Sequence, residues 1–125
     1  MKKKMLLVDD EASILKILEY FFHNKYEVVI KSNAKEAMMW LQQGNTPDMI
    51  IADYKMPGLD GSEFVKHVRS SGLFSDIPMI ILSAQEDSAT KVKCLRAGAD
   101  DYVLKPFNPE EIDARVNNIF RRMRV

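Results

Sequence analysis

Five residues that can do chemistry each close a short apolar stretch of the sequence. They are Asp9, Asp10, Asp53, Ser83 and Lys105. Carboxylates that lie close together repel one another unless a cation or protons compensate them. Because the carboxylates and the hydroxyl supply only oxygen ligands, this set favours a hard divalent ion such as Mg²⁺. An ion of this kind, with a lysine and a hydroxyl facing it, is the arrangement that stabilises a phosphoryl group in transfer.

Within this set, Asp53 is the predicted nucleophile. A carboxylate can attack phosphorus in line and form an aspartyl phosphate. Asp9 and Asp10 would hold the metal ion, and Lys105 would neutralise charge on the phosphoryl oxygens. The prediction requires that all four side chains converge in the folded chain.

The apolar stretches themselves predict the strands of a parallel sheet. They are Met5–Val8, Val28–Ile30, Met49–Ala52, Met79–Leu82 and Tyr102–Leu104. Short unbroken runs are typical of strands that helices cover on both faces. A segment of helical period follows each run, so we expect an α/β fold with a doubly wound, five-stranded parallel sheet of (βα)5 type. In such a sheet, ligands bind beyond the carboxyl ends of the strands, where the five residues fall.

Composition narrows the class of protein. The chain has 125 residues, 46% of them hydrophobic, which suits one packed domain. Lys plus Arg and Asp plus Glu both total 18, so bulk charge favours neither nucleic-acid nor membrane binding. The single cysteine, Cys94, excludes an internal disulfide and fits a reducing compartment. No run approaches the roughly 18 apolar residues of a membrane helix, so we expect a cytoplasmic protein.

Four motifs together resemble the receiver domain of two-component response regulators, over essentially the whole chain. They are Val8–Glu11, Asp53–Gly58, Leu82–Ala84 and Gly98–Phe107. Taken singly, Asp10 could be a helix cap, Ser83 a strand-end hydroxyl and Lys105 a solvated lysine. All four motifs in order, at the predicted strand ends, form a specific signal. The resemblance implies one receiver domain over residues 1–125, with a flavodoxin-like sheet of strand order 2-1-3-4-5.

The resemblance also assigns roles at the site. It implies that Asp53 is the phosphoacceptor and that Mg²⁺ is bound by Asp9, Asp10, Asp53 and the backbone carbonyl of Lys55. Lys105 would pair with the phosphoryl group, and its peptide bond to Pro106 would be cis.

Further residues would transmit or time the signal. By resemblance, Ser83 bonds a phosphoryl oxygen, and Tyr102 is the aromatic residue that swings inward when Ser83 moves. This switch would change the surface of the fourth helix, fifth strand and fifth helix. Lys55 and Gln85 match the positions that flank the path of the hydrolytic water, so we expect them to tune the phosphoryl lifetime.

The function implied is signal transduction. A sensor histidine kinase would donate the phosphoryl group, and an output domain or a separate downstream protein would respond. The chain would assist its own phosphorylation and dephosphorylation without being a conventional turnover enzyme, and would not itself bind nucleic acid. The alternative within the family is a degenerate receiver that acts as an interaction module without phosphorylation.

Two other classes fit less well. A flavodoxin-like cofactor protein needs a phosphate-binding loop after the first strand, where Asp9, Asp10 and Glu11 would repel an anion. A phosphatase of the haloacid-dehalogenase type would carry a second Asp two residues after its nucleophile, where this chain has Lys55.

A dimer is also expected from the resemblance, because the stretch from Lys91 through Arg124 is similar to receivers that precede winged-helix DNA-binding domains. Two copies would join through their fourth and fifth helices. The cross-dimer ion pairs would be Lys91 with Glu111 and Asp101 with Arg115, around an apolar centre of Val92, Leu95 and Ile112. Asp113 departs from this pattern, since the family prefers an apolar residue there, and its charge should weaken the dimer.

Overall fold

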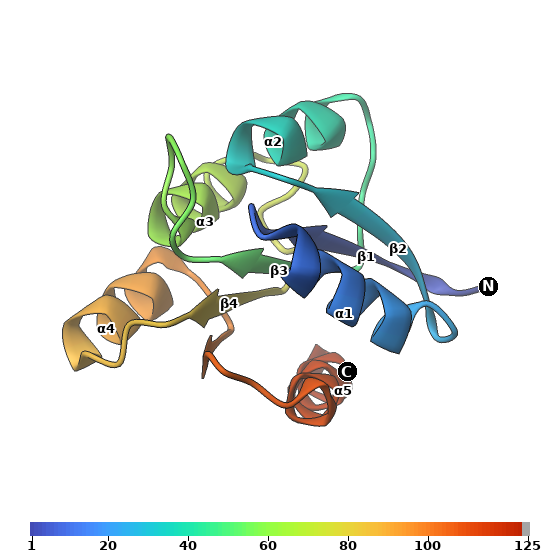
Figure 1. The fold of residues 1–125 in the computed structure, drawn as a ribbon. Coiled ribbons are helices and arrows are strands. Elements are labelled where there is room, and N and C mark those ends of the chain that lie inside the picture. Colours follow the sequence, from blue (N-terminus) through green and yellow to red (C-terminus); the bar gives the residue numbers. More distant parts are fainter. Residues whose placement is uncertain (124–125) are drawn as a thin grey trace.

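A computed structural model describes residues 1–123, which form one sheet between two layers of helices (Figure 1). The strands are β1 (Lys3–Val8), β2 (Tyr26–Lys31), β3 (Met49–Asp53), β4 (Met79–Ser83) and β5 (Asp101–Leu104). The helices are α1 (Ala12–Phe22), α2 (Ala34–Gln42), α3 (Gly61–Arg69), α4 (Ser88–Ala97) and α5 (Pro109–Met123). All paired strands are parallel, in the order β2-β1-β3-β4-β5, which confirms the predicted fold class and strand order.

The central strands are buried on both faces of the sheet. Successive side chains of a strand point to opposite faces, so Leu6 and Ile50 pack with α2, α3 and α4, whereas Leu7 and Ile51 pack with α1 and α5. Every residue of β3 and of β4 is buried. These strands therefore read as unbroken apolar runs in the sequence, as a covered parallel sheet requires.

The edge strands are less covered than the sequence predicted. In β2 only Tyr26 is buried, and Ile30 is 40% exposed. On the opposite edge, Leu104 of β5 is 43% exposed. The expectation that helices cover every strand on both faces is wrong here, because an edge strand lies at the margin of both helix layers.

Specific caps fix where the helices near the site begin and end. Asp60 caps α3 by accepting a hydrogen bond from the Glu63 amide (2.9 Å), and Asn108 caps α5 through the Glu110 amide (2.9 Å). Gly98 ends α4 with a φ of 119°, a backbone conformation that favours glycine. None of the helices in residues 1–123 is long and apolar enough to cross a membrane.

Candidate functional site

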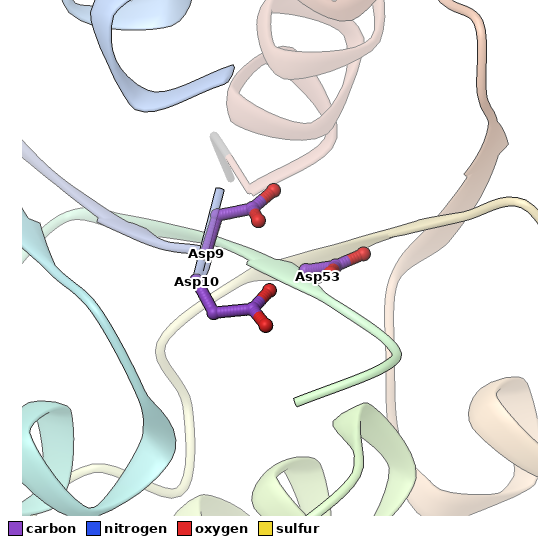
Figure 2. A group of neighbouring side chains, drawn as sticks. All are labelled: Asp9, Asp10 and Asp53. Carbon is purple, nitrogen blue, oxygen red and sulfur yellow. The ribbon is translucent and has the colours of Figure 1, made fainter. Parts of the chain in front are cut away.

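Three carboxylates meet at the carboxyl end of the sheet. β1 and β3 are neighbours, with Val8 opposite Ala52, so Asp9 and Asp53 follow at the same edge. This is also the point where the strand order reverses direction, the place where parallel sheets bind ligands. The side chains of Asp9, Asp10 and Asp53 extend to the same side of this edge (Figure 2), and each offers an oxygen within 4.8 Å of the others. The sequence analysis predicted this convergence.

Lys105 is the cation that faces these carboxylates. Its Nζ lies 3.0 Å from Asp53 Oδ1 and 3.3 Å from Asp9 Oδ2. The loop after β5 brings it there, and its amide donates to the Ser83 carbonyl (2.8 Å). The peptide bond from Lys105 to Pro106 is cis, as expected. Glu11 also approaches Lys105 Nζ, at 3.6 Å, a contact that the sequence analysis did not anticipate.

Burial shifts the protonation of the site. Asp9 and Asp53 are only 1% and 5% exposed. Burial, together with the nearby charge of Asp9, raises the pKa of Asp53 to about 6, although Lys105 acts in the opposite direction. Burial likewise raises the pKa of Asp9. The pKa of Lys105 is raised despite its own burial, because Asp53 and Asp9 stabilise its charged form.

The donor set fits a hard divalent cation. One lysine carries a single positive charge against three converging carboxylates, and burial raises the pKa values of Asp9 and Asp53. A cation bound by their oxygens would supply the missing charge, and carboxylates are the ligands that Mg²⁺ prefers. Asp10 is exposed, so such an ion could keep bound water on its solvent side. The chemistry of the residues therefore agrees with the predicted metal site.

Ser83 and Tyr102 lie beside the carboxylates on β4 and β5. Ser83 is 1% exposed, and its Oγ accepts a hydrogen bond from the Gln85 amide (3.0 Å). Tyr102 lies inward, at 7% exposure, and its hydroxyl donates to the Gln85 carbonyl (2.7 Å). The backbone of Gln85 thus connects the hydroxyl that faces the site to the aromatic residue of β5.

A cleft of about 470 Å³ gives access to the carboxylates. It is lined by Asp10, Glu11, Asp53, Lys55, Met56, Pro57, Ser83, Ala84, Gln85 and Lys105. The Lys55 and Gln85 side chains are exposed on its rim. Both residues predicted to tune the phosphoryl lifetime therefore line the cleft that leads to Asp53.

Gly61 holds the loop after β3 close to the site, and the sequence analysis did not single it out. Its amide donates to the Tyr54 carbonyl (2.6 Å). A Cβ at Gly61 would lie 2.8 Å from Tyr54 Cα and 3.1 Å from the Asp53 carbonyl oxygen. Any larger residue would therefore push the backbone that carries Asp53. The signal in the sequence was its position directly after the cap residue Asp60.

The predicted dimer face needs one correction. Val92 and Leu95 of α4 are exposed, at 41% and 39%. Ile112 of α5 is fully buried and packs in the layer that α1 and α5 form against the sheet. The prediction that Ile112 contributes to an apolar centre between two copies is therefore wrong, because the Ile112 side chain lies in the core of its own domain.

Three of the four charged residues of that face already have partners within the chain. Arg115 Nη1 lies 2.9 Å from Asp101 Oδ2, and Arg115 Nη2 lies 2.9 Å from Glu111 Oε2. Asp113 pairs with Lys25 at 2.9 Å. A dimer that paired Asp101 of one copy with Arg115 of the other would first have to break the ion pairs within each copy. These pairs would therefore add little to the free energy of dimerisation.

Comparison with known proteins agrees with this geometry. The family model described as "Response regulator receiver domain" matches residues 5–117. Among solved structures, the receiver domain of the Francisella response regulator 1452 has a TM-score of 0.87 at 33% identity, covering 98% of this chain and 100% of that one. The CheY4 chemotaxis response regulator of Vibrio cholerae has a TM-score of 0.84 at 31% identity, covering 97% and 98%.

Curated relatives are longer than this chain. The Guillardia theta protein named "Probable transcriptional regulator ycf27" is 45% identical over 122 residues, which are 97% of this chain and 46% of the relative. The Bacillus subtilis "Alkaline phosphatase synthesis transcriptional regulatory protein PhoP" is 40% identical, over 100% of this chain and 51% of the relative. The chain thus spans about half the length of the curated relatives it matches.

Proposed function

The chain belongs to the response regulator receiver family, and on that basis we propose that it accepts a phosphoryl group from a sensor histidine kinase on Asp53. The observation that carries this proposal is the convergence of three carboxylates around Lys105, whose Nζ lies 3.0 Å from Asp53 Oδ1. A cytoplasmic location is part of the proposal, since the lone Cys94 suits a reducing compartment.

The transfer is a single displacement at phosphorus. An oxygen of Asp53 forms the new bond while the bond from phosphorus to the donor histidine nitrogen breaks, and that nitrogen leaves with the bonding electrons. Asp9, Asp10, Asp53 and the carbonyl of Lys55 would hold Mg²⁺, which when bound supplies positive charge to the phosphoryl oxygens. Lys105 would also supply positive charge to these oxygens, and Ser83 would donate a hydrogen bond to one of them.

The proposed switch runs from Ser83 to Tyr102. When Ser83 turns toward a phosphoryl oxygen, its Oγ no longer accepts from the Gln85 amide. The loop that carries Gln85 then moves, and with it the carbonyl to which Tyr102 is bound. The surface of α4, β5 and α5 changes, and an output domain or a separate partner reads that change. Relatives of twice this length named as transcriptional regulators support an output of that kind.

The decisive experiment is intact-mass analysis of the protein after incubation with acetyl phosphate. We expect one phosphoryl group to be added with Mg²⁺ present and none after chelation with EDTA. Absence of the addition, together with failure to bind Mg²⁺, would support the second candidate, a receiver that works as an interaction module without phosphorylation.

Replacing Lys105 with alanine should slow phosphorylation by acetyl phosphate about tenfold or more. The variant loses the ammonium group nearest Asp53 Oδ1, and a charged donor aimed at a phosphoryl group stabilises its transfer strongly. The initial rate of mass increase measures the effect. Lys35→Ala removes the same charge from an exposed position on α2 and serves as the control. Equal rates in the two variants would contradict the role of Lys105.

Replacing Lys55 with alanine should shorten the phosphoryl lifetime. The long Lys55 side chain lies on the rim of the cleft and hinders the water that attacks phosphorus. We expect decay to accelerate about threefold, which corresponds to less than about 1 kcal/mol in the barrier. The measurement is loss of the phosphorylated mass after the donor is removed. An unchanged decay rate would rule out this role.

Phosphorylation-assisted dimerisation through α4, β5 and α5 is also part of the proposal. The exposed Val92 and Leu95 could provide its apolar contacts with Lys91 nearby, but Ile112 cannot. Sedimentation velocity with and without beryllofluoride as a phosphoryl mimic tests it. A monomer under both conditions would exclude the dimer.

A further inference from the structure

A basic groove lies between α3 and α4; none of the three carboxylates lines it, and it shares Val92 with the proposed dimer face. The two helices are side by side (Figure 1). The groove has a volume of about 570 Å³, and the cations along it are Lys66 of α3 and Lys93 and Arg96 of α4. None of the residues that line it is acidic.

Two of the three cations are uncompensated. Lys93 Nζ lies 3.6 Å from Asp60 Oδ2, at the start of α3. Within residues 1–123, neither Lys66 nor Arg96 has a carboxylate within ion-pair distance, and both side chains are exposed. Like charges gathered around a groove favour a ligand of the opposite charge.

Part of the lining of the groove is apolar. Val92 is 41% exposed there, between the small side chains of Ala89 and Ala97. α4 buries only Cys94 against the sheet, so its outward face keeps these apolar atoms available. An apolar strip between cations suits a ligand that presents an apolar side chain flanked by carboxylates.

We propose that this groove docks an acidic, amphipathic segment of a partner protein. Carboxylates of the segment pair with Lys66 and Arg96, and an apolar side chain between them covers Val92. A protein segment fits better than a nucleic acid, because the chain has a formal net charge of zero, and an apolar side chain can cover Val92 whereas a phosphate backbone cannot. The docking does not require phosphorylation of Asp53, so its test is independent of the test of phosphotransfer.

The test measures binding of a labelled acidic peptide by fluorescence anisotropy to the unphosphorylated protein. The probe is a peptide of about 14 residues, long enough for about four helical turns, with Glu and Leu at helical spacing. We expect saturable binding that weakens with salt. The double variant K66E/R96E should bind at least about tenfold more weakly. The matched control K16E/K35E makes the same charge change at exposed positions on α1 and α2 and should bind like the wild type.

Four results would overturn the proposal. The first is no binding of the peptide to the wild type, and the second is an equal loss in both double variants. The third is single-stranded DNA of similar length binding the groove as tightly as the peptide, which would indicate a general polyanion surface. The fourth is self-association of the wild type that K66E/R96E abolishes, which would make a second copy of the chain the occupant.

Discussion

Replacing Asp53 with asparagine is expected to abolish the Mg²⁺-dependent addition of a phosphoryl group from acetyl phosphate. The amide has nearly the shape of the carboxylate, so the packing of this 5% exposed residue is kept. Its oxygen is no longer an anionic nucleophile, and no other carboxylate can take its place. Asp9 and Asp10 follow β1 and would hold Mg²⁺ together with Asp53, but Asp53 Oδ1 is the carboxylate oxygen closest to the Lys105 ammonium, at 3.0 Å against 3.3 Å for Asp9.

The control for this variant is Asp76→Asn, which changes an exposed carboxylate between α3 and β4. It should gain one phosphoryl group at the wild-type rate. An Asp53→Asn protein that still gains the group would place the acceptor elsewhere and would contradict the assignment. If neither variant gained a phosphoryl group, the assay would be reporting on overall folding instead of on the acceptor.

The sequence predicted the fold and the centre of the site because both depend on strand ends. Each unbroken apolar run became a strand, and parallel strands bring their carboxyl ends to one edge. Asp9 and Asp53 therefore had to meet once β1 and β3 were neighbours. The residue types then limited the chemistry, since carboxylates beside a lysine fit a metal ion and a phosphoryl group.

Residues whose neighbours depend on helix rotation were harder to predict. Ile112 belongs to the apolar stripe of α5, and the sequence alone does not say which member of a stripe faces the core. Arg115 lies one turn from Glu111 and also reaches Asp101 across the chain, and the sequence alone does not decide whether such pairs form within one copy or between two. The close approach of Gly61 to Tyr54 depends on the path of a loop, which has no hydrophobic period to reveal it.

The same Asp53→Asn change should stabilise the metal-free protein by about 2 to 3 kcal/mol at about pH 8. A pKa that rises from 3.8 to about 6 on folding means that the folded state binds this proton more tightly than the unfolded chain. The folded state therefore loses stability as the pH rises from about 4 through about 6, and the loss amounts to about 3 kcal/mol above that range. Asparagine has no proton to lose and escapes this penalty.

Urea unfolding of both proteins in EDTA, at about pH 8 and at about pH 4, measures the effect. The stabilisation should shrink to less than about 1 kcal/mol at about pH 4, where Asp53 is protonated in the folded state. Mg²⁺ at about pH 8 should also reduce the stability difference between variant and wild type, because binding of the cation stabilises the wild type more than the variant. Asp76→Asn should change stability by less than about 0.5 kcal/mol under all these conditions. A variant that is no more stable than the wild type at about pH 8 would contradict the raised pKa of Asp53, because it would show that Lys105 fully offsets the cost of burying this carboxylate.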